Sequence, residues 1–90
     1  MYELDFSDNA LRDAAYLRKT EPAAYRKLES LLLELMIDPR SGTGRIELMK
    51  YGLQGHYSRR ITKKHRLVYT IKDDVLIVNI VSMLGHYGDK

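Results

Sequence analysis

Residues 75–84 read VLIVNIVSML, and we expect the sheet to be built around this stretch because it is apolar on both of its sides. Successive side chains of a β-strand point to opposite faces of the sheet. One set of alternating positions holds Val75, Ile77 and Val81, and the other holds Leu76, Val78 and Ile80. This pattern predicts a central strand over residues 75–84 that is covered on both faces.

Three more strands are predicted ahead of it, over residues 45–49, 57–62 and 66–72. The turns between the four strands are short. Gly52 and Gly55 bracket the first turn, Lys63-Lys64 occupies the second, and Asp73-Asp74 occupies the third. Because parallel strands need a long crossover connection, turns of this length predict antiparallel pairing throughout the second half of the chain.

The first half predicts one strand and two helices. Residues 2–6 alternate apolar and acidic side chains, as in a half-buried strand. Ser7 is a favourable N-cap for a helix that runs to about Arg18. Pro22 starts a second helix, whose apolar stripe ends before Pro39, because the residue before a proline is driven out of the helical region. The two helices form a hairpin that needs a surface to cover.

The resulting order, β-α-α-β-β-β-β, predicts an α+β fold and a single domain over residues 1–90. We expect the N-terminal strand and the two-helix hairpin to pack on a twisted, mainly antiparallel sheet. A chain of 90 residues has room for one hydrophobic core.

Composition excludes several classes of protein. The chain has no cysteine, so it has no disulfide framework and no thiolate metal site. Its three histidines lack the spacing of metal ligands, and we expect neither a metal nor another cofactor. No apolar run approaches the length of a membrane span, and the acidic N-terminus differs from a signal peptide. These features favour a cytoplasmic protein with no membrane partner.

Positive charge is concentrated in residues 45–66. This segment holds seven of the fifteen Lys and Arg residues but only one of the twelve acidic residues, whereas the whole chain carries a formal charge of +3. A polyanion responds to the local field and to local hydrogen-bond donors, so this segment predicts an RNA-binding surface. The expected phosphate contacts are Arg45, Lys50, Arg59, Arg60, Lys63 and Lys64. The alternative is a solvated hairpin whose charges prevent aggregation at a sheet edge.

The only acid in this segment, Glu47, and a histidine near the end of the chain, His86, suggest catalysis. Cleavage of RNA by its own 2′-hydroxyl needs a base to remove that proton and an acid to protonate the leaving 5′-oxygen. It also needs cations to stabilise the extra negative charge on phosphorus. Glu47, the arginines and His86 can fill these roles without a metal. Taken singly, each residue is better explained without catalysis: Glu47 as a charge-balancing surface residue, and His86 as part of an incidental tail.

At this point the chain closely resembles the YoeB/Txe toxins of bacterial toxin–antitoxin modules, within the RelE-like superfamily. The resemblance is carried by RIELMK (residues 45–50), LQGHYSRRIT (53–62), HRLVY (65–69) and the distal His86-Tyr87. It differs from the usual family pattern at Tyr57, where a tryptophan is typical, and in the added Gly88-Asp89-Lys90 at the end.

The resemblance implies an endoribonuclease that cleaves mRNA in the ribosomal A site and is neutralised by a cognate YefM-like antitoxin. It implies Glu47 as the base, Arg66 as the arginine of the transition state, His86 as the acid, and Tyr87 as an aromatic neighbour of the acid. It also implies the 70S ribosome as a partner and a possible homodimer. Two alternatives stay open: a non-catalytic RNA- or ribosome-binding module that uses the basic hairpin, and a partner protein whose basic face binds only an acidic antitoxin.

Overall fold

The computed structural model describes residues 1–50, 52 and 54–85, and its elements follow the predicted order. They are β1 (Glu3–Phe6), α1 (Asp8–Thr20), α2 (Pro22–Ile37), β2 (Ile46–Leu48), β3 (His56–Arg60), β4 (Arg66–Lys72) and β5 (Ile77–Ser82). The α+β prediction is therefore confirmed. The bounds of β4 are as predicted, whereas β2 and β3 are shorter than expected.

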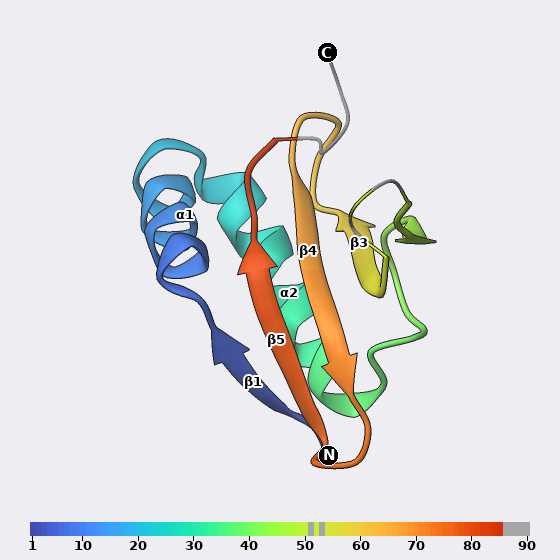
Figure 1. Cartoon of the computed structure of the whole chain (residues 1–90). Helices are drawn as coiled ribbons and strands as arrows, with labels where there is room; N and C mark the ends of the chain where they lie inside the picture. Colours follow the sequence, from blue (N-terminus) through green and yellow to red (C-terminus); the bar gives the residue numbers. More distant parts are fainter. Residues whose placement is uncertain (51, 53, 86–90) are drawn as a thin grey trace.

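The sheet has the strand order β1-β5-β4-β3-β2 (Figure 1). The three neighbouring pairs from β5 to β2 are antiparallel, as the short turns predict, and β1 runs parallel to β5. The first and last strands of the chain are therefore neighbours, and the sheet is mainly antiparallel.

The helix termini follow local rules of capping. The Ser7 hydroxyl oxygen accepts a hydrogen bond from the Ala10 N–H at 2.9 Å, which confirms the predicted N-cap of α1. Helix α1 continues to Thr20, slightly beyond the expected end. Glu21 separates the two helices, and Pro22 is the first residue of α2, where its missing N–H costs nothing.

The helical hairpin covers one face of the sheet (Figure 1). Helix α2 buries Leu28, Leu31 and Leu35 completely, and Leu67 and Ile80 are their fully or almost fully buried counterparts on the sheet. Each buried side chain of this size contributes about 1.5–3 kcal/mol relative to exposure. Within residues 1–50, 52 and 54–85, no helix lies on the opposite face of the sheet.

The predicted strand over residues 75–84 begins later than expected. Val75 and Leu76 close the turn after β4; they are 55% and 46% exposed, and Leu76 has a φ of 54°. Strand β5 does lie inside the sheet, between β1 and β4. The prediction that both of its faces are covered is wrong for the part of the chain that the structure describes, where the two helices meet one face only. Val78 and Ile80 are buried there, whereas the alternate positions are half-buried.

A polar cluster joins three segments at the β4–β5 turn. The Arg40 guanidinium donates two hydrogen bonds to the Asp73 carboxylate, both at 2.9 Å, and the Tyr2 hydroxyl donates to it at 2.7 Å. The hydrogen bonds from Arg40 and Tyr2 lower the pKa of Asp73 to about 2. The cluster ties the N-terminus and the loop after α2 to this turn.

Candidate functional site

Four polar residues lie on the face of the sheet that is turned away from the helices, which we call the open face: Glu47, Ser58, Arg60 and Arg66. In the strand register, Glu47 of β2 is opposite Ser58 of β3, and Arg60 of β3 is opposite Arg66 of β4. Leu67 and Tyr69 belong to the helix-facing core, so the alternate residues of β4 point away from the helices. The pleat thus brings the predicted base and the predicted transition-state arginine to the same face.

These two side chains are in contact. Glu47 Oε1 lies 3.6 Å from Arg66 Nη1, and Glu47 Oε2 lies 3.6 Å from Arg45 Nε. The carboxylate side chain is 49% exposed and the Arg66 side chain only 14% exposed. Arg66 Nη1 also donates to the buried Ser58 hydroxyl at 3.5 Å. A solvent-accessible carboxylate is therefore held against a largely shielded guanidinium.

Ser58 is a site residue for which sequence reasoning assigned no role. Its hydroxyl accepts a hydrogen bond from Arg66 across the neighbouring strands and so helps to orient that guanidinium. The position of Ser58 could have been predicted from strand pairing. In an antiparallel hairpin with this turn, Ser58 must lie on the same face as Arg60 and Arg66.

Arg60 and Arg66 face each other directly across β3 and β4. Like charges at directly opposed positions destabilise a sheet. Among the buried side-chain atoms of the described residues, Arg60 Nε has no hydrogen-bond partner. The arginine guanidinium has the bidentate geometry that phosphate matches, so this pair could hold a phosphate group.

Four other predicted phosphate contacts are exposed. Arg45 and Lys50 flank β2, while Lys63 and Lys64 occupy the turn between β3 and β4. Lys64 Nζ lies 3.4 Å from the Glu21 carboxylate. Contacts of these residues with RNA stay predictions.

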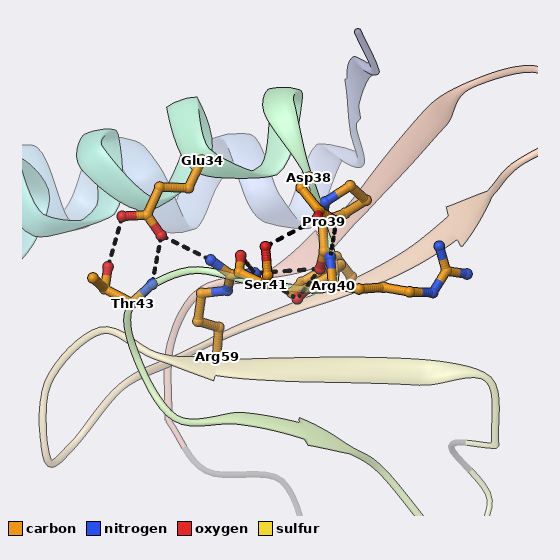
Figure 2. Close-up of polar contacts among 8 residues, drawn as sticks. Glu34, Asp38, Pro39, Arg40, Ser41, Thr43 and Arg59 are labelled. Atoms are coloured by element: carbon orange, nitrogen blue, oxygen red, sulfur yellow. Dashed lines mark hydrogen bonds and ion pairs between the residues drawn. The ribbon is translucent and has the colours of Figure 1, made fainter.

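Arg59 requires a correction, because its side chain is fully buried and cannot reach RNA. Strand alternation turns it toward the helices (Figure 2). Tyr57 and Ile61, at alternate positions, also belong to the helix-facing core. Its guanidinium pairs with Glu34 at 3.0 Å and donates to the carbonyl oxygens of Pro39 at 3.2 Å and Ser41 at 2.9 Å.

The role of Arg59 is to hold the loop that leads into β2. Glu34 accepts hydrogen bonds at 2.7 Å from both the backbone N–H and the hydroxyl of Thr43. These bonds, together with the positive charge of Arg59, lower the pKa of Glu34. Residues 39–44 are therefore anchored to α2 and β3 a few residues before Glu47 (Figure 2). Arg59, which was expected to bind RNA, instead supports the loop that leads into the strand of Glu47.

His86 and Tyr87 lie outside the described residues. The residue before them, Gly85, is described, and its carbonyl oxygen accepts a hydrogen bond from the Arg66 N–H at 3.1 Å. The backbone segment that leads to His86 therefore starts beside Arg66.

Within residues 1–50, 52 and 54–85, no three His, Asp or Glu side chains lie close enough together to hold a metal ion. In the same part of the chain, neither α1 nor α2 is long and apolar enough to cross a membrane.

Comparison with known proteins gives consistent results. Residues 6–87 match the sequence model of the YoeB-like toxin of bacterial type II toxin–antitoxin systems. Toxin YoeB from Escherichia coli K12 is 36% identical over 76 residues, which cover 84% of this chain and 90% of the relative.

Solved structures agree with this similarity. The YoeB dimer from Staphylococcus aureus superposes with a TM-score of 0.84 at 34% identity, over 96% of this chain and 98% of that chain. A YoeB–YefM complex from the same organism superposes with a TM-score of 0.81 at 34% identity, over 97% of this chain and 99% of that chain.

Proposed function

The chain belongs to the YoeB-like toxins of bacterial type II toxin–antitoxin systems, and on this premise we propose that it is a metal-independent endoribonuclease that cleaves mRNA in the ribosomal A site and so inhibits translation. The observation that carries the proposal is the contact between Glu47 and Arg66 on the open face of the sheet. A surface that only binds RNA gains nothing from a carboxylate among its cations, since it repels phosphate.

In the proposed reaction, the Glu47 carboxylate removes the proton of a ribose 2′-hydroxyl, and the 2′-oxygen attacks the adjacent phosphorus. The bond from phosphorus to the 5′-oxygen breaks, and His86 gives that oxygen its proton. The products are a 2′,3′-cyclic phosphate and a 5′-hydroxyl. General acid and base groups of this kind each contribute about 10²–10⁴-fold to the rate.

Arg66 stabilises the negative charge that develops on the phosphoryl oxygens. Its shielding by Ser58 and the neighbouring strands keeps water from weakening that interaction. Arg60, Arg45 and Lys50 hold the phosphates on either side, and Lys63 and Lys64 extend the contact along the β3–β4 turn. Tyr87 shapes the site next to the acid.

We further propose two protein partners besides the ribosome. A YoeB from Staphylococcus aureus has been solved with YefM, and a YoeB from the same organism has been solved as a dimer. A YefM-like antitoxin with an acidic segment fits the basic face that residues 45–66 provide, and a homodimer is the expected state without the antitoxin.

The test is mRNA cleavage on programmed ribosomes by purified wild-type protein and by Glu47→Gln, Arg66→Ala and His86→Ala. Each variant should lose at least about 100-fold in single-turnover rate while still binding ribosomes. Glu29→Gln, at an exposed position on the helical side, is the matched control and should cleave normally. Translational inhibition without cleavage, retained by Glu47→Gln, would establish the non-catalytic binding module instead.

A further inference from the structure

One buried histidine takes no part in the proposed reaction, yet it connects three distant segments. His65, in the turn between β3 and β4, has Nε2 at 3.0 Å from the Glu21 carboxylate at the junction of α1 and α2. Its Nδ1 accepts a hydrogen bond from the backbone N–H of Gly85, after β5, at 3.0 Å. The three segments lie at the same end of the sheet (Figure 1).

The contacts define the protonation state of His65. A backbone N–H can only donate, so Nδ1 must carry a lone pair. Nε2 therefore carries the proton and donates a hydrogen bond to the Glu21 carboxylate. This hydrogen bond is the main reason that the pKa of Glu21 is lowered. His65 is a neutral imidazole with a partner on each ring nitrogen, and its side chain is almost fully buried.

Gly85 is held on both sides as a result. Its N–H donates to His65, and its carbonyl oxygen accepts from the Arg66 N–H at 3.1 Å. Two residues earlier, the Met83 N–H donates to the Asp13 carboxylate at 2.8 Å. Gly85 has a φ of 75°, a conformation open to glycine but with little intrinsic rigidity, so external contacts must hold it in place. The next residue in the chain is His86.

We propose that His65 is a positioning residue for the general acid His86 and acts through Gly85; this role rests on the function proposed above. The neutral imidazole fixes Gly85, the residue before His86 in the sequence, next to Arg66. Displacing a reacting group by about 1 Å can cost about 100-fold in rate. His65 thus connects the junction of α1 and α2 with the position of His86, the residue that would protonate the leaving oxygen.

The ring nitrogens suggest two matched variants. In His65→Asn, the amide oxygen can occupy the place of Nδ1 and still accept from Gly85, but the contact with Glu21 is lost. In His65→Gln, the amide nitrogen can occupy the place of Nε2 and still donate to Glu21, but the acceptor for Gly85 is lost. A role limited to packing the turn predicts similar effects for both variants.

The decisive measurement compares two substrates on programmed ribosomes. One is ordinary mRNA, and the other carries sulfur in place of the scissile 5′-oxygen, so that the leaving thiolate needs no proton. On ordinary mRNA, His65→Gln should be slower by about 10–100-fold, and His65→Asn should stay within about threefold of wild type. On the sulfur substrate, His65→Gln should recover to near the wild-type rate, and His86→Ala should do the same.

The ratio of the two rates is robust to partial unfolding, because both rates come from one preparation and a loss of folded protein lowers them equally. Exchange of the Gly85 amide proton gives a second readout: its protection should be lost in His65→Gln and retained in His65→Asn. An unchanged rate ratio in His65→Gln overturns the positioning role while the nuclease function stands. If the wild-type protein cleaves neither substrate, both the proposed function and this role are wrong.

Discussion

Replacing Glu34 by alanine should destabilise the fold strongly, because it removes the anionic partner of a fully buried guanidinium. Arg59 has no exposed surface, and its ion pair with Glu34 at 3.0 Å is the charge contact shown for it in Figure 2. Removing one partner of a buried ion pair costs about 3–5 kcal/mol. The Glu34 side chain is 31% exposed, so water can partly replace it, and we expect the lower end of that range, about 3 kcal/mol.

Urea unfolding followed by circular dichroism measures this loss. For a small domain with a slope of about 1.5 kcal/mol/M, the midpoint should fall by about 2 M. Glu29→Ala, the same change at an exposed position of the same helix, should stay within about 0.5 kcal/mol of wild type.

Arg59→Met separates the contribution of the ion pair from that of the loop contacts. Without the cation, Glu34→Ala should cost only its bonds to Thr43, about 1 kcal/mol, so the two changes should couple by about 2 kcal/mol. If Glu34→Ala unfolds with the same midpoint as Glu29→Ala, the argument that Arg59 depends on its carboxylate is wrong.

Three further outcomes are expected. The pKa of Asp73 is lowered from 3.8 to about 2, so the ionised carboxylate stabilises the fold above pH 3.8, and this stabilisation is lost as the pH falls toward 2. In urea titrations from pH 6 to pH 2, the unfolding midpoint of Asp73→Asn should lie below that of the wild type, and the difference should shrink between about pH 4 and pH 2. A difference that stays constant over this range would contradict the argument. The single-turnover cleavage rate should fall on both sides of an optimum, because Glu47 must be ionised and His86 protonated, and a flat profile from about pH 5 to pH 9 would count against this pair. Ser7→Ala should lower the free energy of unfolding by about 1 kcal/mol through loss of the α1 cap, measured by the same urea titration, and no change would mean that another group caps the helix.

The sequence predicts best those structural features that depend on neighbouring residues. The cap at Ser7, the restart at Pro22 and the strand over residues 66–72 all appear as predicted, since capping, proline geometry and alternation act within a few residues. It failed at Val75 and Leu76, where apolar character suggested a strand. There, closure of the turn after β4 overrides the local preference.

The candidate site also combines features that the sequence predicts with features that it does not. Sequence alone identified the basic segment and Glu47 as its only acid, and the family resemblance implied Arg66 as the arginine of the transition state. Alternation also required Arg59 and Arg60 to point to opposite faces of one strand. It could not say which face the helices would cover.

Only the tertiary structure decided that Arg59 turns inward and supports the loop before β2, while Arg60 faces Arg66 on the open side. Likewise, no sequence pattern joins Glu21, His65 and Gly85, since their contacts form only when the helical junction, the β3–β4 turn and the end of β5 meet. The physical reason is that a side chain's type is local, but its burial and its hydrogen-bond partners depend on elements far away in the chain.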